Sequence, residues 1–159
     1  MAPRVGDSGL TPLLWTLLVL VHVLAASFWV GGQLMLVVVV MPVLRRSGSP
    51  TLVRELASAA GRRFAAVTNW VLLPVLVVSG IVLAALNGVR PGNLTTTPFG
   101  RVLLVKAGLV AAVFALAAIH GTAARRMGPR RIRFLAALTL LVSVAILGLG
   151  AALAVLPGP

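Results

Sequence analysis

Cysteine is absent from this 159-residue chain, and only two residues, Asp7 and Glu55, are acidic. The lack of cysteine excludes disulfides, cysteine-ligated zinc and thiol chemistry. No acidic residue lies within a long apolar run, which argues against the carboxylate proton relay of a membrane pump. Charged residues make up 10% of the chain, whereas about a quarter is usual for a soluble domain. The composition therefore indicates an integral membrane protein.

The formal net charge of +12 would suit a nucleic-acid-binding protein, but the basic residues flank apolar runs, as topology signals do in a bilayer. We therefore expect the lipid bilayer, and no nucleic acid, as a partner. The apolar runs predict one all-α membrane domain over residues 1–159, an integral membrane four-helix bundle. Its expected elements are a short interfacial helix at about 50–60 and spans at about 13–41, 64–86, 102–124 and 134–156.

Pro74 interrupts the second apolar run and removes the hydrogen bond that its N–H would give to the carbonyl of Trp70, so we expect a kink there. The first and third loops carry ten of the fourteen basic residues, namely Arg45, Arg46, Arg54, Arg62, Arg63, Arg125, Arg126, Arg130, Arg131 and Arg133. The positive-inside rule places these loops in the cytoplasm and both termini outside, in the plasma or inner membrane.

Polar residues within the spans are candidates for a site, because lipid disfavours them. His22 shares a helical face with Trp29 and Gln33. We estimate the depth of each polar residue in the membrane by counting about 1.5 Å of helix per residue from the arginine loops. The estimates fall at two depths, an outer level near the extracytoplasmic surface and an inner level near the cytoplasmic surface. The outer level holds His22, Lys106 and Ser79, and the inner level holds His120 and Asn69. The two histidines are then about 20 Å apart, too far to share one metal ion or one haem.

Each of these residues also has a purely structural interpretation. His22 could simply bond a carbonyl or a headgroup, and Lys106 could extend its ammonium to the interface. If Lys106 turns inward, it would suit an anionic group such as a propionate or phosphate. Copper prefers Cys, Met or His ligands. The chain has no Cys, four Met including the initiator and two distant His, which makes at most one His-anchored site in each leaflet. No trio of nucleophile, base and orienting residue is visible, which favours a protein that is not an enzyme.

Several motifs resemble, in the same order, those of the CopD-type copper resistance membrane proteins. They are H-V-L-A-A-S-F-W-V-G-G (His22 to Gly32), G-R-R-F-A-A-V (Gly61 to Val67), V-V-S-G-I-V-L (Val77 to Leu83) and T-P-F-G-R-V-L-L-V-K (Thr97 to Lys106). The resemblance implies an inner-membrane protein of copper uptake or tolerance, served by an extracytoplasmic copper-binding protein. The residues that match are His22, Trp29, Gly31, Gly32, Gly80, Gly100, Arg101 and Lys106. Among them, the resemblance implies His22 as the copper ligand.

The chain is also similar in outline to HemJ-type protoporphyrinogen oxidases, which have a first-helix His and a third-helix Lys. That resemblance implies haem b or a porphyrin with His22 as axial ligand and Lys106 at the propionates. Three hypotheses thus stand: a copper-handling protein with Trp29, Gln33, Ser79, Arg101 and Lys106 lining the His22 site, a haem- or porphyrin-binding oxidoreductase, and a structural accessory subunit. A homo-oligomer or a larger membrane complex is compatible with each.

Overall fold

The computed structural model describes the backbone of residues 12–46, 49–123 and 128–158, and their side chains except at 118–123, 129 and 133. These residues form helices and turns, with no strand. Four helical stretches are long and apolar enough to cross a membrane: Pro12–Arg46, Pro50–Leu86, Pro98–Ala117 and Arg130–Val155. The prediction of an all-α chain with four spans is therefore confirmed. The described residues fall into two compact units, here called the 9–83 unit and the 84–159 unit.

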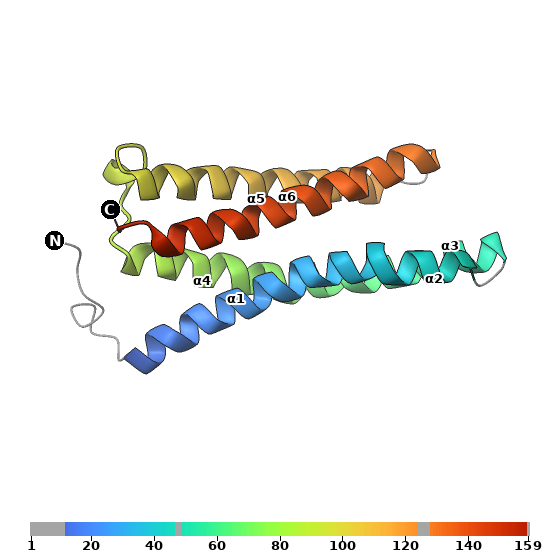
Figure 1. Cartoon of the computed structure of the whole chain (residues 1–159), viewed down its shortest axis with the longest axis horizontal. Coiled ribbons are helices and arrows are strands. Elements are labelled where there is room, and N and C mark those ends of the chain that lie inside the picture. Colours follow the sequence, from blue (N-terminus) through green and yellow to red (C-terminus); the bar gives the residue numbers. More distant parts are fainter. Residues whose placement is uncertain (1–11, 47–48, 124–127, 159) are drawn as a thin grey trace. The chain divides into compact units, whose positions relative to one another are not determined.

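The 9–83 unit is a pair of long helices joined near residue 48. The first runs without a break through α1 (Pro12–Leu34), the π-helix η1 (Met35–Val40) and α2 (Met41–Arg46). The second consists of α3 (Pro50–Val67), the π-helix η2 (Thr68–Leu72) and α4 (Leu73–Leu86), whose last turn is counted with the other unit. Figure 1 shows α1 and α4 side by side. The stretch expected to be a short interfacial helix, at about 50–60, forms the beginning of α3.

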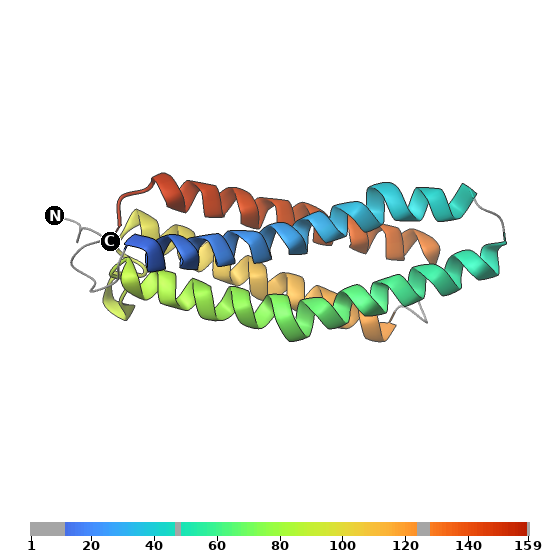
Figure 2. The same ribbon diagram turned by 90° about the horizontal axis from the view of Figure 1, so that it is seen from below.

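Both π-helices end two residues before a proline. The N–H of Met41, which precedes Pro42, donates to the carbonyl of Leu36, and the N–H of Leu73, which precedes Pro74, donates to that of Thr68. A proline lacks an N–H, and its ring clashes with the carbonyl four residues earlier. The wider π turn accommodates the ring, so the first helix continues to Arg46 instead of ending at Met41. The second helix bends near η2 (Figure 2).

The 84–159 unit contains the short 3-10 helix η3 (Pro91–Asn93) and two α-helices, α5 (Pro98–Ala123) and α6 (Pro129–Val155), which lie side by side (Figure 1). The loop before α5 is closed by Asn93, whose Nδ2 donates to the carbonyl of Gly88 at 2.9 Å and whose Oδ1 accepts from the N–H of Arg90 at 2.8 Å. Gly88 has a φ of 78°, which glycine adopts without strain.

Prolines mark the starts of these helices. Pro50, Pro98 and Pro129 are the first residues of α3, α5 and α6, the position where a missing N–H is harmless. Ser49 is the N-cap of α3 and acts through its carbonyl, which accepts from the N–H of Val53 at 3.1 Å, whereas its side chain makes no cap bond.

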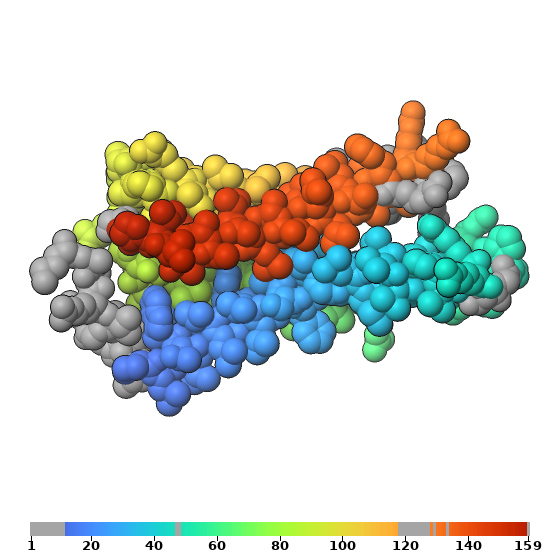
Figure 3. All heavy atoms as spheres, in the orientation of Figure 1, coloured from blue at the N-terminus to red at the C-terminus, as the bar shows by residue number. Residues whose placement is uncertain are grey.

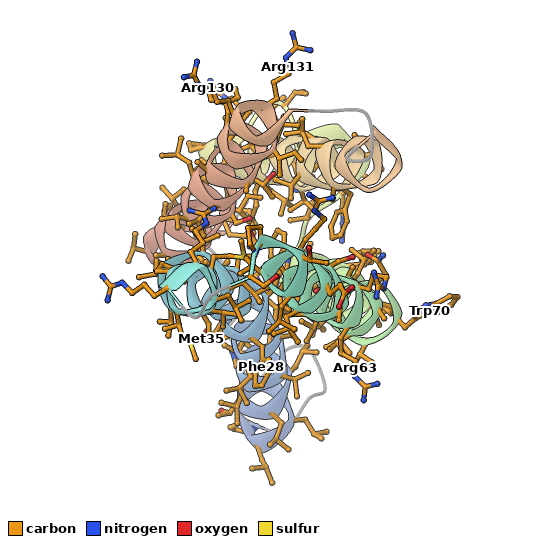
Figure 4. The ribbon with its side chains drawn as sticks, turned by 90° about the vertical axis from the view of Figure 1, so that its right-hand side faces the viewer. Phe28, Met35, Arg63, Trp70, Arg130 and Arg131 are labelled. Atoms are coloured by element: carbon orange, nitrogen blue, oxygen red, sulfur yellow. The ribbon has the colours of Figure 1, made fainter. Side chains whose placement is uncertain are left out.

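The outward faces of the helices are apolar. Phe28 is 71% exposed, Leu141 69% and Trp70 83%, and side chains cover the visible faces of α1 and α6 along their length (Figure 3). Figure 4 shows Phe28, Met35 and Trp70 pointing away from their helices. Such surfaces belong in lipid, because large exposed apolar patches are rare on soluble monomers.

Candidate functional site

His22 on α1 meets Ser79 on α4 within the 9–83 unit. The Nδ1 of His22 lies 2.7 Å from the Oγ of Ser79, a residue 57 positions later in the chain. The imidazole is half-buried and Ser79 is buried, with 4% of its surface exposed. The structure therefore brings together two of the residues that depth alone assigned to the outer level.

The hydrogen bonds of Ser79 determine the tautomer of His22. The Oγ of Ser79 also contacts the carbonyl of Val75, four residues earlier, at 2.5 Å. A serine hydroxyl has one proton and a carbonyl can only accept, so both contacts are hydrogen bonds when Ser79 donates to Val75 and Nδ1–H of His22 donates to Ser79. The ring lone pair then lies on Nε2. Metal-binding histidines typically use one ring nitrogen in this way while the other is oriented by a hydrogen bond.

Gly80 lets the imidazole lie close to the backbone of α4. A Cβ added at Gly80 would lie 3.3 Å from Cε1 of His22 and 3.9 Å from its Nδ1. The ring is thus held by a hydrogen bond at Ser79 and by close packing at Gly80. Preorganisation of this kind fixes the direction in which Nε2 points.

Further along α1, the packing against the second helix is tight and mostly apolar. A Cβ at Gly32 would overlap the ring of Phe64. Trp29 is buried, with 5% exposed, and Gln33 is half-buried. Thr68, the first residue of η2, is 7% exposed, and its Oγ1 has no hydrogen-bond partner among the described residues.

Asn69, the inner-level candidate, follows Thr68 in η2 and is exposed. The second inner-level candidate, His120, lies on α5, and its side chain falls outside the described part of the structure. No geometry therefore bears on a site formed by these two residues.

In the 84–159 unit, Lys106 lies on α5 and is half-buried, whereas Arg101 is exposed in the first turn of that helix. The Nζ of Lys106 is near α6, because a Cβ added at Gly150 would lie 3.4 Å from it. The lysine side chain thus runs along the neighbouring helix of its own unit, and Gly150 provides the room.

The described residues contain no group of three or more His, Cys, Asp or Glu side chains that could hold a metal ion. His22 by itself offers one imidazole nitrogen, so a copper ion bound there needs further ligands from another molecule or another part of the chain. One imidazole is also enough for a single axial bond to haem iron. The local chemistry of the site is thus that of one oriented nitrogen ligand.

Sequence reasoning identified His22 and Ser79 but missed the contacts between glycines and side chains. Gly32 with Phe64, Gly80 with His22 and Gly150 with Lys106 each pair a glycine on one helix with a large side chain on another. Glycines within apolar spans are the available signal, because small residues allow membrane helices to approach closely. The sequence does not say which side chain enters each gap.

Comparison with known proteins supplies the family. A curated protein of Aquifex aeolicus (strain VF5), named only "Uncharacterized protein", is 38% identical over 77 residues, 47% of this chain and 52% of the relative. The chain thus spans about half the length of that relative. No solved structure matches the chain.

A family model described as copper resistance protein D matches residues 58–153. This range runs from α3 into α6 and includes Ser79, Gly80 and Lys106, but it begins after α1 and so leaves out His22. It covers more than half of the chain, and its membrane character agrees with the four apolar helices. The chain therefore belongs to the copper resistance protein D (CopD) family, as a multi-pass protein of the plasma or inner membrane.

Proposed function

We propose that this protein takes part in copper uptake or tolerance and that His22 is the residue at which copper first binds it, near the extracytoplasmic end of α1. Family membership supports the copper chemistry. The observation that carries the proposal is the hydrogen bond of 2.7 Å between Nδ1 of His22 and Ser79. Together with the bond from Ser79 to Val75, it supports the tautomer whose lone pair is on Nε2, and a metal ion could bind there.

Copper is the cargo in this proposal, and an extracytoplasmic copper-binding protein delivers it. Imidazole is a suitable ligand for copper. A single imidazole cannot complete a coordination sphere, so the delivering partner keeps some of its own ligands on the ion while His22 binds. Such sharing favours transfer over storage, because the ion is never enclosed by this chain alone.

We propose further that Trp29 and Gln33, which follow His22 on α1, line the path inward, and that Arg101 and Lys106 belong to the outer level. Trp29 and Gln33 lie seven and eleven residues after His22, on the same helical face. Asn69 and His120 would form the inner level, near the arginine loops. The proposal for the inner level rests on the membrane depth of Asn69 and His120 as counted from the arginine loops in the sequence.

The test compares three variants in copper binding by detergent-purified protein. His22→Asn keeps a donor near the position of Nδ1 and removes Nε2, so it should preserve the packing and abolish stoichiometric copper. Ser79→Ala should retain copper at an affinity lowered about 10- to 100-fold, because it loses only the orienting acceptor. Thr16→Ala is the matched control, since Thr16 also bonds a carbonyl four residues earlier, at 2.8 Å, and should bind copper normally.

Elemental analysis and an absorption spectrum of each variant decide the outcome. Unchanged copper in His22→Asn would contradict the proposal. A Soret band in the native protein that disappears in His22→Asn would assign haem b to this residue instead. Native protein with neither copper nor haem, and cells with unchanged copper tolerance for His22→Asn, would identify a structural accessory subunit.

A further inference from the structure

Lys106 is the only lysine of the chain. Among the residues whose side chains the structure describes, it is the only basic one well inside a span of the 84–159 unit. It lies eight residues after Pro98, the first residue of α5, which corresponds to about 12 Å along the helix. Its ammonium is near Gly150, five residues and about 8 Å before the end of α6. The side chain therefore leads toward the membrane surface but ends between two helices, not in open lipid.

Among the described residues of this unit, 84–123 and 128–158, none is acidic, so none can neutralise that ammonium. Residues 84 to 159 contain no Asp or Glu, and the only acidic residues elsewhere are Asp7 and Glu55. A charged side chain inside a membrane normally pairs with an opposite charge or with backbone carbonyls. The C-terminal end of α6 offers only the helix dipole, equivalent to roughly half an elementary charge.

We propose that Lys106, whose ammonium lies beside Gly150 between α5 and α6, binds a phosphate group, supplied either by a phospholipid or by inorganic phosphate. An ammonium is a compact point charge that suits phosphate oxygens. Headgroup phosphates occupy the rim of the bilayer within reach of a lysine at this depth. Because Gly150 has no side chain, Nζ lies close to the backbone of α6, and a Cβ there would be in van der Waals contact with it, at 3.4 Å. The inference does not depend on copper binding at His22.

The single lysine makes the site directly measurable. Delipidated protein in a maltoside detergent is acylated with an amine-reactive acetate ester, and mass spectrometry follows the Lys106 peptide with the N-terminal amine as an internal standard. Addition of phosphatidylglycerol or of inorganic phosphate should slow acylation of Lys106 at least fivefold, in a saturable manner. Protection by the lipid alone assigns a headgroup, and protection by inorganic phosphate assigns a soluble anion.

Two glycine variants locate the site. Gly150→Val places branched side-chain atoms against Nζ and should reduce the protection to less than twofold. Gly148→Val is the matched control, because a Cβ at Gly148 has nothing within 4 Å, and it should be protected like the native protein. Native mass spectrometry gives a second measurement that does not require Gly150→Val to fold: Lys106→Arg should retain the bound lipid or phosphate, and Lys106→Met should lose it.

Several results would overturn the proposal. They are no protection by either phosphate source, equal protection in Gly150→Val and Gly148→Val, or equal retention by Lys106→Met and Lys106→Arg. Faster acylation in Asp7→Asn than in the native protein, measured without phosphate, would identify Asp7 as an internal counter-ion and would overturn it too.

Discussion

The two units each contain a pair of consecutive membrane helices, but they place their prolines differently. In the 9–83 unit, Pro42 and Pro74 lie inside the helices, and each follows a π-helix. In the 84–159 unit, Pro98 and Pro129 begin α5 and α6, and these helices contain no π segment where the structure describes them. The comparison teaches that a proline within a span here changes the register of the helix without ending it.

This change of register places Phe64 and the Ser79–Gly80 pair on the same face of the second helix, the face that contacts α1. At 100° per residue, Ser79 and Gly80 would lie on average about 110° around the helix axis from Phe64 in an uninterrupted α-helix. One extra residue in η2 reduces that angle to about 10°. Phe64 can then pack on Gly32 while Ser79 and Gly80 contact His22, all on α1. The π segment thus positions the candidate copper ligand.

The largest expected effect is a difference in cysteine labelling between the two sides of the membrane. It tests whether the arginine loops of both units lie on the same side. The chain has no cysteine, so single cysteines can be introduced at Ser49, Gly92 and Gly128. The positive-inside rule predicts that an impermeant thiol reagent labels position 92 in intact cells and positions 49 and 128 only after permeabilisation. Labelling of 49 and 128 from opposite sides would contradict the four-span topology.

A large loss of stability is expected for Gly100→Ala in the 84–159 unit. A Cβ there would lie 2.5 Å from the carbonyl oxygen of Leu94 and 2.6 Å from that of Asn93, and backbone cannot move aside as a flexible side chain can. We expect the free energy of unfolding to fall by about 3 kcal/mol, measured by titration with a denaturing detergent.

The control for this substitution is Gly108→Ala, because a Cβ at Gly108 meets nothing within 4 Å. Within a helix, alanine in place of glycine should stabilise by about 0.5–1 kcal/mol. Equal unfolding midpoints for the two variants would mean that the loop before α5 does not pack on Gly100 as described.

The smallest change in stability, but a specific change in geometry, is expected for Pro74→Ala. The new N–H can restore the α-helical pattern, and its hydrogen bond, worth about 1 kcal/mol, offsets part of the packing that is lost. Removal of the extra residue would rotate Ser79 away from His22. Oxidative cross-linking of a His22→Cys, Ser79→Cys pair should therefore fall to less than half when Pro74→Ala is added.

Pro50→Ala is the control for the cross-linking experiment, because Pro50 begins α3 and no helical N–H is missing there. Its cross-linking yield should match that of the parent pair. An unchanged yield in Pro74→Ala would show that packing, and not the proline, maintains the π-helix.

The elements of the fold could largely be predicted from the sequence, because their signals are local. Apolar length predicted the four spans. Pro74 predicted a kink, and the second helix bends near η2, but the π-helix before the proline was not predicted. The end of the first helix at Arg46 was missed for the same reason at Pro42.

The candidate site was only partly predictable. Counting residues placed His22 and Ser79 at similar depth, but their contact depends on how two helices are rotated against each other, which periodicity does not give. The close approach of His22 to Gly80 and of Lys106 to Gly150 likewise depends on how neighbouring helices are rotated against each other. The depths predicted for Lys106, His120 and Asn69 remain predictions, as does the extracytoplasmic location of the termini.

The length of the first helix affects how the protein sits in its membrane. From Leu13 to Leu44 no residue is charged, a stretch of about 48 Å against a hydrocarbon layer of about 30 Å. Such hydrophobic mismatch is relieved by tilt or by local thickening of the lipid, and both depend on acyl-chain length. The choice of lipid in reconstitution therefore adjusts how deeply the imidazole of this helix sits, and short-chain and long-chain bilayers place it at different distances from the water outside.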